Sequence, residues 1–251
     1  MNRGAGRQPV FRTTRDRLRF IDLLAEGVTA STVELHAFAL MGNHYHLILH
    51  CPDGGLSDLM HRLGSMYTRY VNWRLERDGP LFRGRFHSVL VDTPEYLNCA
   101  GRYVHRNPLD LWAVTRLDEY PWSSYRYYVD TRPRPEWLTT EALASMHDGP
   151  DGYRAFVEGS VPAETASVEW AIDTAMMEFG DRVDLMTPHV RRAVLLAMSE
   201  RADDAPARAL AQLIAFPSPT ARRMALQRLR RRIVAQPVLA DVAARALELV
   251  A

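Results

Sequence analysis

Hydrophobic positions in the first part of the chain follow two periods, one typical of helices and one typical of strands. Apolar residues spaced three and four apart predict helices over residues 15–27, 56–77 and 96–107. Apolar runs rich in β-branched and aromatic residues predict strands over residues 33–41, 44–51 and 86–91. The turn dipeptide Gly42-Asn43 joins the first two strands in a hairpin. This order predicts an α+β fold, a small antiparallel sheet with helices on one face.

The pattern changes after Asp130, where a polar stretch with two prolines begins. We interpret residues 131–150 as a linker, because Pro133 and Pro135 do not suit a helix interior. Beyond this linker the β pattern disappears and helical periods follow one another, which predicts an all-α domain over residues 151–251. Residues 1–130 then form the α+β domain, which contains the candidate chemistry.

Composition places the chain among ordinary globular proteins, with 47% hydrophobic and 24% charged residues. No apolar run approaches the roughly 20 residues of a membrane span, and the basic N-terminus lacks the apolar core of a secretory signal. Cys51 and Cys99 are far apart in the sequence, which favours reduced thiols over a metal site or a disulfide. These features predict a cytoplasmic protein without a membrane partner.

Charge is distributed unevenly, although the net charge is only +1. All 31 basic residues are arginine. Residues 1–108 carry 14 arginines and 10 acidic residues, and residues 216–251 carry 7 arginines and 2 acidic residues. The stretch between them is acidic, with 10 arginines and 18 acidic residues. Because a phosphate backbone responds to local potential, both basic ends are candidates for contact with nucleic acid.

The sharpest local motif is His44-Tyr45-His46 on the second predicted strand. Alternate side chains of a strand share a face, so the two imidazoles point one way and Tyr45 points the other way. Two adjacent imidazoles on a rigid strand suit a divalent metal ion. The alternative is a pair of exposed strand histidines without a ligand.

A second candidate group lies at the end of the third predicted helix. Tyr103 and Asn107 are four residues apart and therefore share a helical face. An asparagine carbonyl is a suitable ligand for Mg²⁺ or Mn²⁺, and a tyrosine one turn away would hold its phenol oxygen near that ion. The alternative for Tyr103 is core packing with a hydrogen-bonded hydroxyl.

Arginines interleaved with aromatic residues mark a candidate surface for DNA. The arginines that we select on the long helix and in the loop after it are Arg62, Arg69, Arg74, Arg83 and Arg85. Arginines neutralise phosphates, and extruded bases can stack on aromatic side chains such as Tyr67, Tyr70 and Trp73. The alternative for the helix is a solvated face over an aromatic core.

Near the C-terminus, two helical stretches are joined by a short turn at residues 217–220. The second stretch is basic, which is typical of a helix-turn-helix with a recognition helix. The candidate DNA contacts there are Arg222, Arg223 and Arg230. Any helical bundle can show the same pattern, so a structural role is the alternative.

Five short motifs occur in order along residues 2–130. They lie at residues 41–47 (MGNHYHL), 79–86 (GPLFRGRF), 96–97 (YL), 102–109 (RYVHRNPL) and 120–125 (YPWSSY). This series resembles the REP-associated tyrosine transposases. Those proteins are relatives of the single-strand transposases of bacterial insertion sequences, within the wider class of His-hydrophobic-His nucleases. The resemblance implies a sheet of the ferredoxin-like or RRM-like type.

Matched residue by residue, the resemblance implies that His44, His46 and Asn107 hold Mg²⁺ or Mn²⁺ and that Tyr103 is the nucleophile. Tyr103 would nick single-stranded DNA at hairpins of the extragenic palindromic type and keep a 5′-phosphotyrosine for strand transfer. The expected partner is therefore single-stranded hairpin DNA, which would associate the protein with the nucleoid. A homodimer stays open beside a monomer.

Two departures from that family leave other functions open. Gly42 stands where the family usually has proline, and the sequence begins at Asn2-Arg3-Gly4, the segment that ends the family's first strand. We therefore expect the first strand to be missing, so a non-catalytic DNA-binding or regulatory protein derived from such a transposase is an alternative. A metal-dependent hydrolase that uses water is a third reading, but it leaves Tyr103 unexplained.

Overall fold

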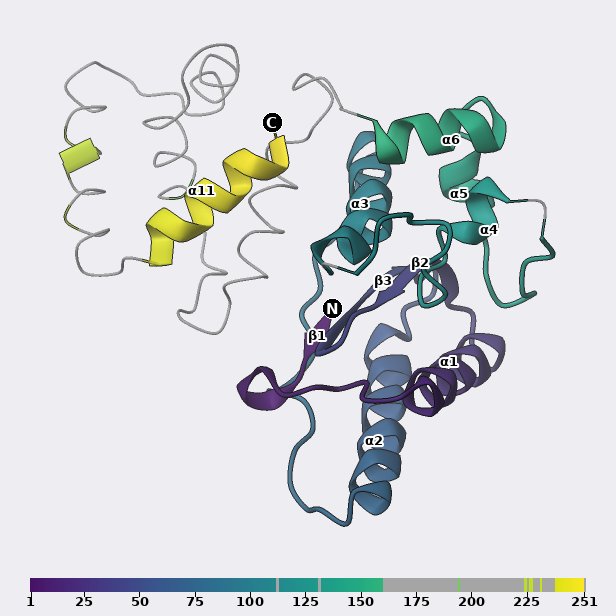
Figure 1. Cartoon of the computed structure of the whole chain (residues 1–251), viewed down its shortest axis with the longest axis vertical. Coiled ribbons are helices and arrows are strands. Elements are labelled where there is room, and N and C mark those ends of the chain that lie inside the picture. The colour runs from purple at the N-terminus through teal and green to yellow at the C-terminus, as the bar shows by residue number, and fades with distance from the viewer. Residues whose placement is uncertain are drawn as a thin grey trace. The chain divides into compact units, whose positions relative to one another are not determined.

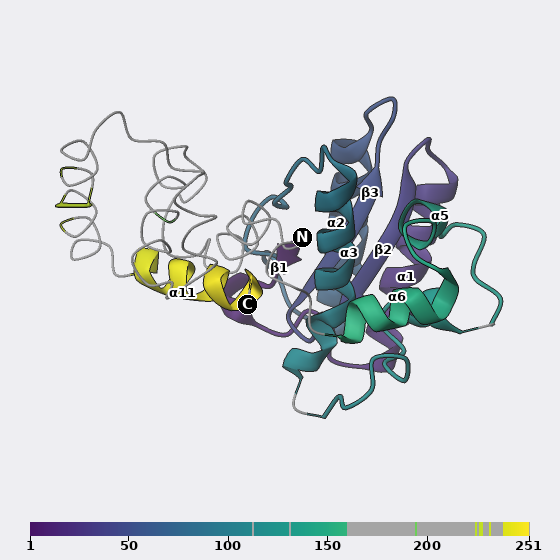
Figure 2. The ribbon, with the colours of Figure 1, turned by 90° about the horizontal axis from the view of Figure 1, so that it is seen from above.

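The computed structural model describes residues 1–111, 113–130, 132–159, 194, 224, 226–227, 231 and 238–250, which fall into two compact units (Figure 1; Figure 2). The first unit consists of Met1–Asp92 and Ala100–Gly159. The second groups Thr93–Cys99 with Ser160–Ala251, and in it helix α11, Val238–Val250, is described. Apart from residues 151–159, α11 and a few single residues, the all-α domain predicted over residues 151–251 lies outside the described residues. Among the described helices, none is long and apolar enough to cross a membrane.

The first unit is built on a three-stranded antiparallel sheet with the order β1-β3-β2 (Figure 1). The strands are β1, Asn2–Arg3; β2, Glu34–Leu40; and β3, His44–His50. The predicted hairpin is confirmed, since β2 and β3 pair along nearly their whole length. Strand β3 is central because β1 pairs with its other edge, with Arg3 opposite His44. The expectation that the first strand is missing is therefore wrong for Asn2 and Arg3, which form β1.

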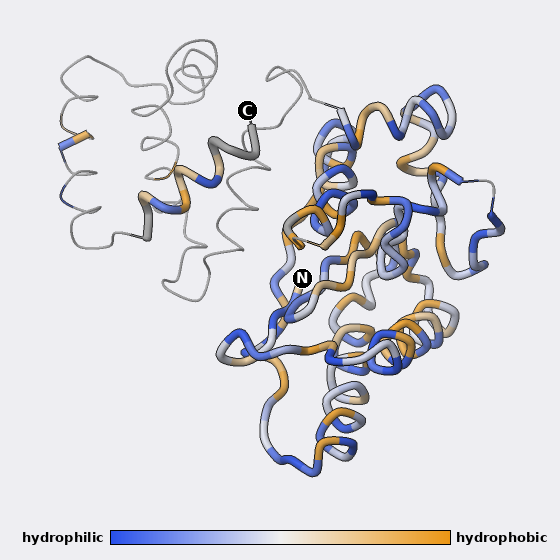
Figure 3. Tube along the Cα trace, in the orientation of Figure 1, coloured by the Kyte–Doolittle hydropathy of each residue, from blue (hydrophilic) through white to orange (hydrophobic). Residues whose placement is uncertain are grey.

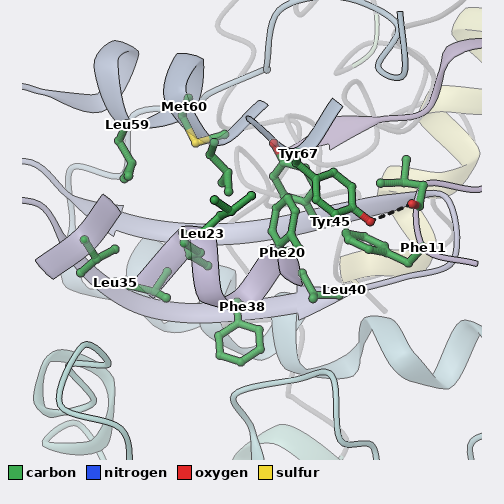
Figure 4. Close-up of a cluster of buried hydrophobic side chains, with 14 of the residues drawn as sticks. Phe11, Phe20, Leu23, Leu35, Phe38, Leu40, Tyr45, Leu59, Met60 and Tyr67 are labelled. Carbon is green, nitrogen blue, oxygen red and sulfur yellow. Dashed lines mark hydrogen bonds between the residues drawn. The ribbon is translucent and has the colours of Figure 1, made fainter. Parts of the chain in front are cut away.

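Helices α1, Thr14–Thr29, and α2, Leu56–Arg74, cover one face of the sheet (Figure 1). Hydrophobic and hydrophilic positions alternate along both helices in Figure 3, as expected of helices with one buried side. In Figure 4, Phe20 of α1, Tyr67 of α2 and Tyr45 of β3 lie in one cluster. The Phe20 ring centroid is 4.7 Å from that of Tyr45 and 5.1 Å from that of Tyr67. This cluster joins both helices to the central strand.

The remaining elements of the first unit follow the sheet in the chain or precede α1. They are η1, Ala5–Arg7; α3, Pro94–Arg106, which belongs to this unit from Ala100 onward; η2, Asn107–Asp110; α4, Arg126–Val129; α5, Glu141–Ala144; and α6, Gly149–Glu158. Figure 1 places α3 to α6 across the sheet from α1 and α2. The predicted α+β class with a small antiparallel sheet is confirmed, and helices cover both faces where the sequence pattern led us to expect one.

Local periodicity predicted the hairpin and helices α1, α2 and α3 correctly. The three predicted helices correspond to α1, α2 and α3, and no predicted end differs from the observed one by more than three residues. Helix α1 begins with a capping box between Thr13 and Asp16. Helix α2 ends earlier than expected because Glu76 has a φ of 48°, a left-handed conformation that does not continue a helix.

The strand predicted over residues 86–91 is wrong, because the structure has no strand there. A strand needs a partner along its length. In the described part of the chain, one residue of this segment, His87, forms backbone hydrogen bonds with Met1, the residue before β1. His87 N donates to the Met1 carbonyl at 2.9 Å, and the Met1 amine donates to the His87 carbonyl at 2.7 Å. Leu90, further along, is 82% exposed.

Residues 131–150, which composition assigned to a linker, pack within the first unit. Leu138 and Leu143 are buried, and Leu138 forms a parallel bridge with Leu35 of β2. The first compact unit continues to Gly159, beyond the Asp130 at which the sequence pattern changes. Packing of these apolar residues, rather than the two prolines, sets the extent of this unit.

Helix α3 is joined to the segment that follows it through a fully buried histidine. His105 Nδ1 lies 2.7 Å from the Tyr153 hydroxyl of α6, and its Nε2 lies 2.8 Å from Ser124 Oγ. Burial lowers the pKa of His105 to about 3, so the ring is neutral, with one nitrogen donating and the other accepting. The neutral ring therefore needs one partner of each kind, and Tyr153 and Ser124 supply them.

Two arginines of α3 complete this connection by capping the end of α6. Arg102 donates to the carbonyls of Phe156 at 3.0 Å and Gly159 at 2.7 Å, and Arg106 donates to the carbonyl of Val157 at 2.7 Å. The last carbonyls of a helix lack partners within the helix, so charged donors satisfy them well. Helix α6 thus holds the C-terminal half of α3 in one orientation.

We expect Tyr153→Phe to lower the free energy of unfolding by about 1–3 kcal/mol, because one buried nitrogen of His105 loses its partner. Urea denaturation measures this change. The control is Tyr127→Phe, whose partly exposed hydroxyl accepts a hydrogen bond from Arg126. This control should change stability by less than about 0.5 kcal/mol. Equal losses in the two variants would contradict the role given to His105.

Candidate active site

The two histidines of the central strand lie side by side on the face opposite the α1–α2 core. His44 and His46 have ring centroids 5.1 Å apart, at nearly right angles. Tyr45 between them points the other way and is fully buried in the core. The alternation expected from the sequence thus places Tyr45 in the core and the two candidate metal ligands on the opposite face of β3.

Helix α3 brings the other two predicted residues to the same place. The Tyr103 ring packs edge-on against His46 with centroids 5.1 Å apart, and the Asn107 side chain hydrogen-bonds to His44. Asn107 also donates from Nδ2 to the Tyr103 carbonyl at 3.0 Å. Both side chains are buried. The four candidate residues, predicted from two separate motifs, therefore form one cluster between β3 and α3.

Burial keeps both imidazoles in the neutral form that a metal ion requires. Burial, together with the charge of Arg3, lowers the pKa of His44 to about 4. Burial and the neighbouring His44 hold the pKa of His46 well below its ordinary value. His46 Nε2 is buried and has no hydrogen-bond partner among the described residues, and His44 Nδ1 lies 2.7 Å from Asn43 Oδ1. An unsatisfied buried nitrogen beside a second imidazole and an amide fits a metal-binding site.

Sequence reasoning missed one cation beside this cluster. Strand pairing sets Arg3 opposite His44, and Arg83 donates its backbone N–H to the Arg3 carbonyl at 3.0 Å. Burial and, after it, the charge of Arg3 lower the pKa of Arg83 as well as that of His44, so the two guanidinium groups are near one another. Arg83 and Arg85 are exposed, as expected of residues that meet DNA. Arg3 was visible in the motif at residues 2–4, but its place depends on the strand register.

The arginines of α2 lie elsewhere. Arg62 and Arg69 are exposed on α2, which packs on the Tyr45 face, so the sheet lies between them and the two histidines. Arg62 lines a shallow hollow that also contains Asp22 and Glu26 of α1. Those acidic residues weaken the attraction of this point for phosphate. Arg69 does not line that hollow, so it is the better candidate of the two for contact with phosphate.

The aromatic residues of α2 divide into core and surface. Tyr67 is fully buried, and its hydroxyl donates to the Val10 carbonyl at 3.0 Å, so it does not stack on bases. Tyr70 is half-buried and donates to Asp16. Trp73 is 76% exposed and lies one turn after Arg69. Trp73 is thus the aromatic residue of this helix that a base can reach.

Arg74 has a structural role that the sequence did not reveal. Its guanidinium lies 2.8 Å from the carboxylate of Asp16, which is completely buried. The same carboxylate accepts the backbone N–H groups of Arg12 and Thr13, each at 2.9 Å. A buried carboxylate needs this compensation. We therefore expect Arg74 to stabilise the fold, and its contact with DNA stays a prediction.

The candidate contacts in the C-terminal part cannot be placed in the same way. Arg222, Arg223 and Arg230 lie outside the described residues. Their role in a helix-turn-helix stays a prediction.

Fold and site together define a class of protein: a small antiparallel sheet with two histidines on its central strand, faced by a helix that carries a tyrosine. Residues 2–107 match the model of the family described as "Transposase IS200 like". This part of the chain is therefore similar to an IS200-like transposase domain, and the similarity supports a DNA-processing function of the transposase type. No curated protein and no solved structure matches the chain.

The contrast between Arg74 and Arg69 can be tested with one substitution each. Arg74→Ala should lower the free energy of unfolding by roughly 1.5–3 kcal/mol, because the buried Asp16 carboxylate loses a charged partner. Arg69→Ala should leave stability within about 0.5 kcal/mol and weaken binding of single-stranded DNA, with a salt slope shallower by about 0.7. Urea unfolding and DNA titrations at several salt concentrations measure both effects. A stable Arg74→Ala protein with weakened DNA binding would reverse the two assignments.

Proposed function

We propose that this protein nicks single-stranded DNA at hairpins of the extragenic palindromic type and rejoins strands through a 5′-phosphotyrosine. The convergence of the two histidines with Tyr103 and Asn107 on one side of β3 carries this proposal. A tyrosine that served only to pack would not require neutral imidazoles and an amide around it. The five motifs of the sequence support the REP-associated subgroup within the family.

In the proposed reaction, Tyr103 Oη attacks the scissile phosphorus in line with the leaving oxygen. The new oxygen–phosphorus bond forms as the bond to the 3′ oxygen breaks. Tyr103 loses its proton, the leaving oxygen takes one up as a 3′-hydroxyl, and the 5′-phosphate stays on the tyrosine. Attack by another 3′-hydroxyl reverses these steps and joins the strands, so the bond energy is conserved.

His44, His46 and Asn107 are the residues that would hold the metal ion in this site. They offer two imidazole nitrogens and an amide oxygen, and this mixed set accommodates Mg²⁺ or Mn²⁺. When bound, the ion neutralises charge on the phosphate oxygens. The chain's own contribution is orientation. Asn43 Oδ1, at 2.7 Å, fixes the proton of His44 on Nδ1, which leaves Nε2 as the ligand atom.

Cations beside the site position the DNA. Arg3 and Arg83 lie at the β1 edge, next to His44, and Arg85 follows in the same exposed loop. Together they neutralise the phosphates that flank the scissile one and fix the register of the strand. Gly84 between the two loop arginines accepts a hydrogen bond from Asn2 at 3.3 Å, which ties this loop to β1.

The short first strand does not favour the non-catalytic alternative. Its two residues pair with β3 opposite Tyr45 and His44, at the level of the histidine motif. The packing of Tyr103 on His46 and the attachment of α3 to α6 involve residues beyond β1. The geometry therefore supports a competent enzyme rather than a decayed one.

Incubated with labelled hairpin DNA and Mg²⁺ or Mn²⁺, the protein should form a covalent adduct that survives denaturing electrophoresis. Tyr103→Phe should abolish the adduct because it lacks the attacking oxygen. The matched control is Tyr96→Phe, which removes a hydroxyl from the same helix about two turns earlier and should keep the adduct. An adduct that persists in Tyr103→Phe would refute the assignment of the nucleophile.

His44→Ala and His46→Ala should each reduce cleavage by on the order of 100-fold or more, because charge on the phosphate is no longer neutralised. Hairpin affinity should change only a few-fold, since arginine–phosphate contacts supply most of it. His61→Ala, an exposed histidine of α2, is the control. Parallel loss of binding and cleavage, with a lowered melting temperature, would instead mean that the two histidines stabilise the fold.

A further inference from the structure

A second group of metal-ligating side chains lies at the open end of the β2–β3 hairpin, away from the turn that precedes His44. Glu34 and His50 are directly opposite each other in the register, and His36 lies beside them. One ligand atom of each residue lies within 4.8 Å of the others. Glu34 Oε2 is 3.3 Å from His50 Nδ1 and 3.8 Å from His36 Nε2. The two imidazole rings are stacked, with centroids 6.0 Å apart.

An irregularity in strand β2 produces this grouping. The register shifts between Leu35 and Ala37, so β2 has one residue more than β3 at this point, and that residue is His36. An extra residue of this kind forms a β-bulge, which turns a side chain to a new direction. Leu35 and Ala37 on either side stay fully buried. The bulge thus keeps the core intact while His36 lies against Glu34.

A backbone carbonyl holds the His36 ring in the orientation that a ligand needs. His36 Nδ1 lies 3.0 Å from the Thr139 carbonyl oxygen, and the residue is 6% exposed. A carbonyl only accepts, so Nδ1 carries the proton and Nε2 presents its lone pair toward Glu34. Metal-binding histidines commonly donate their second nitrogen to a carbonyl in this way. Thr139 N also donates to the Leu35 carbonyl at 2.9 Å, which holds the accepting Thr139 carbonyl beside β2.

The donor set indicates which metal the group takes. Two imidazoles and one carboxylate are a ligand set that Zn²⁺ takes in proteins, with water in the fourth position. Tetrahedral Zn²⁺ with bonds of about 2.0–2.1 Å needs ligand atoms roughly 3.3–3.5 Å apart. The distance of 3.3 Å between Glu34 Oε2 and His50 Nδ1 already falls in this range. Glu34 and His50 are both about half exposed, so they can adjust toward the fixed His36 ring and leave a fourth position to water.

We propose that Glu34, His36 and His50 form a Zn²⁺-type metal site, separate from the proposed Mg²⁺ or Mn²⁺ site at His44 and His46. The ion would join the open ends of β2 and β3. Through the His36–Thr139 hydrogen bond it would also attach the segment after α4 to the sheet. The site does not depend on the proposed strand-transfer reaction, because none of its residues belongs to that cluster.

The test uses the full chain with His44→Ala and His46→Ala, which removes the other pair of imidazoles. Titration with Zn²⁺ alone, followed by calorimetry, should show tight binding, and Zn²⁺ should raise the melting temperature. Adding His50→Ala to this background should weaken Zn²⁺ binding roughly tenfold or more, and Glu34→Gln should weaken it as well. His61→Ala in the same background is the matched control and should leave the affinity unchanged. His50 and Glu34 are exposed enough that these substitutions spare the core.

A second series in the otherwise unchanged chain guards against misfolding of the double variant. There, His50→Ala should lower the amount of Zn²⁺ bound by one equivalent, while adduct formation with Mg²⁺ and hairpin DNA continues. Zn²⁺ affinity and stoichiometry that are the same with and without His50 would overturn the proposal. Failure of adduct formation in the unchanged chain would instead count against the strand-transfer reaction and leave the Zn²⁺ result standing.

Discussion

Alternation along β3 is the constraint on which the rest of the first unit depends. Tyr45 must enter the core between α1 and α2, and this commits His44 and His46 to the opposite face. A slip of one residue would place the tyrosine among the polar groups and a histidine in the core. Two features hold the register: Met41 N donates to the His44 carbonyl at 2.9 Å across the turn, and β1 pairs with the other edge of the strand.

The position of Tyr103 depends on a different set of contacts, which come from later in the chain. Successive residues of one α3 segment serve two purposes. Tyr103 and Asn107 face the histidines, while Arg102 and Arg106 cap α6 and His105 lies between Tyr153 and Ser124. A tyrosine nucleophile must be held in line with its target, since misplacement of a reacting group by about 1 Å is costly. The residues after Asp130 would therefore support the proposed chemistry, although they contribute no residue to the cluster.

These contacts explain how far the sequence could predict the structure. Helices α1 to α3 and the hairpin follow from local periodicity, and the site residues follow from two short motifs with the right spacing. The failed strand at residues 86–91 has strand-like residues, but a strand also requires a paired neighbour, which local pattern does not encode. The same holds for Arg74, which looks like any arginine on a helix surface until the buried Asp16 is known. Arg3 beside His44 and His36 in its bulge likewise depend on register, and register is a property of two strands together.

The arginines of the first unit fall into two groups, one that stabilises the fold and one that is exposed and proposed to bind DNA. The buried Asp16 carboxylate pairs with Arg74 within the fold, so the charge of this arginine is already neutralised by Asp16. Arg69 and Arg83 are exposed. The imidazoles near Arg3 and Arg83 are neutral, so they add no charge of their own. His50 lies six positions after His44 on β3, about 20 Å along an extended strand. At that distance the two proposed sites are separate, so an ion at the turn end would contact phosphate, whereas an ion at the open end would join the two strands.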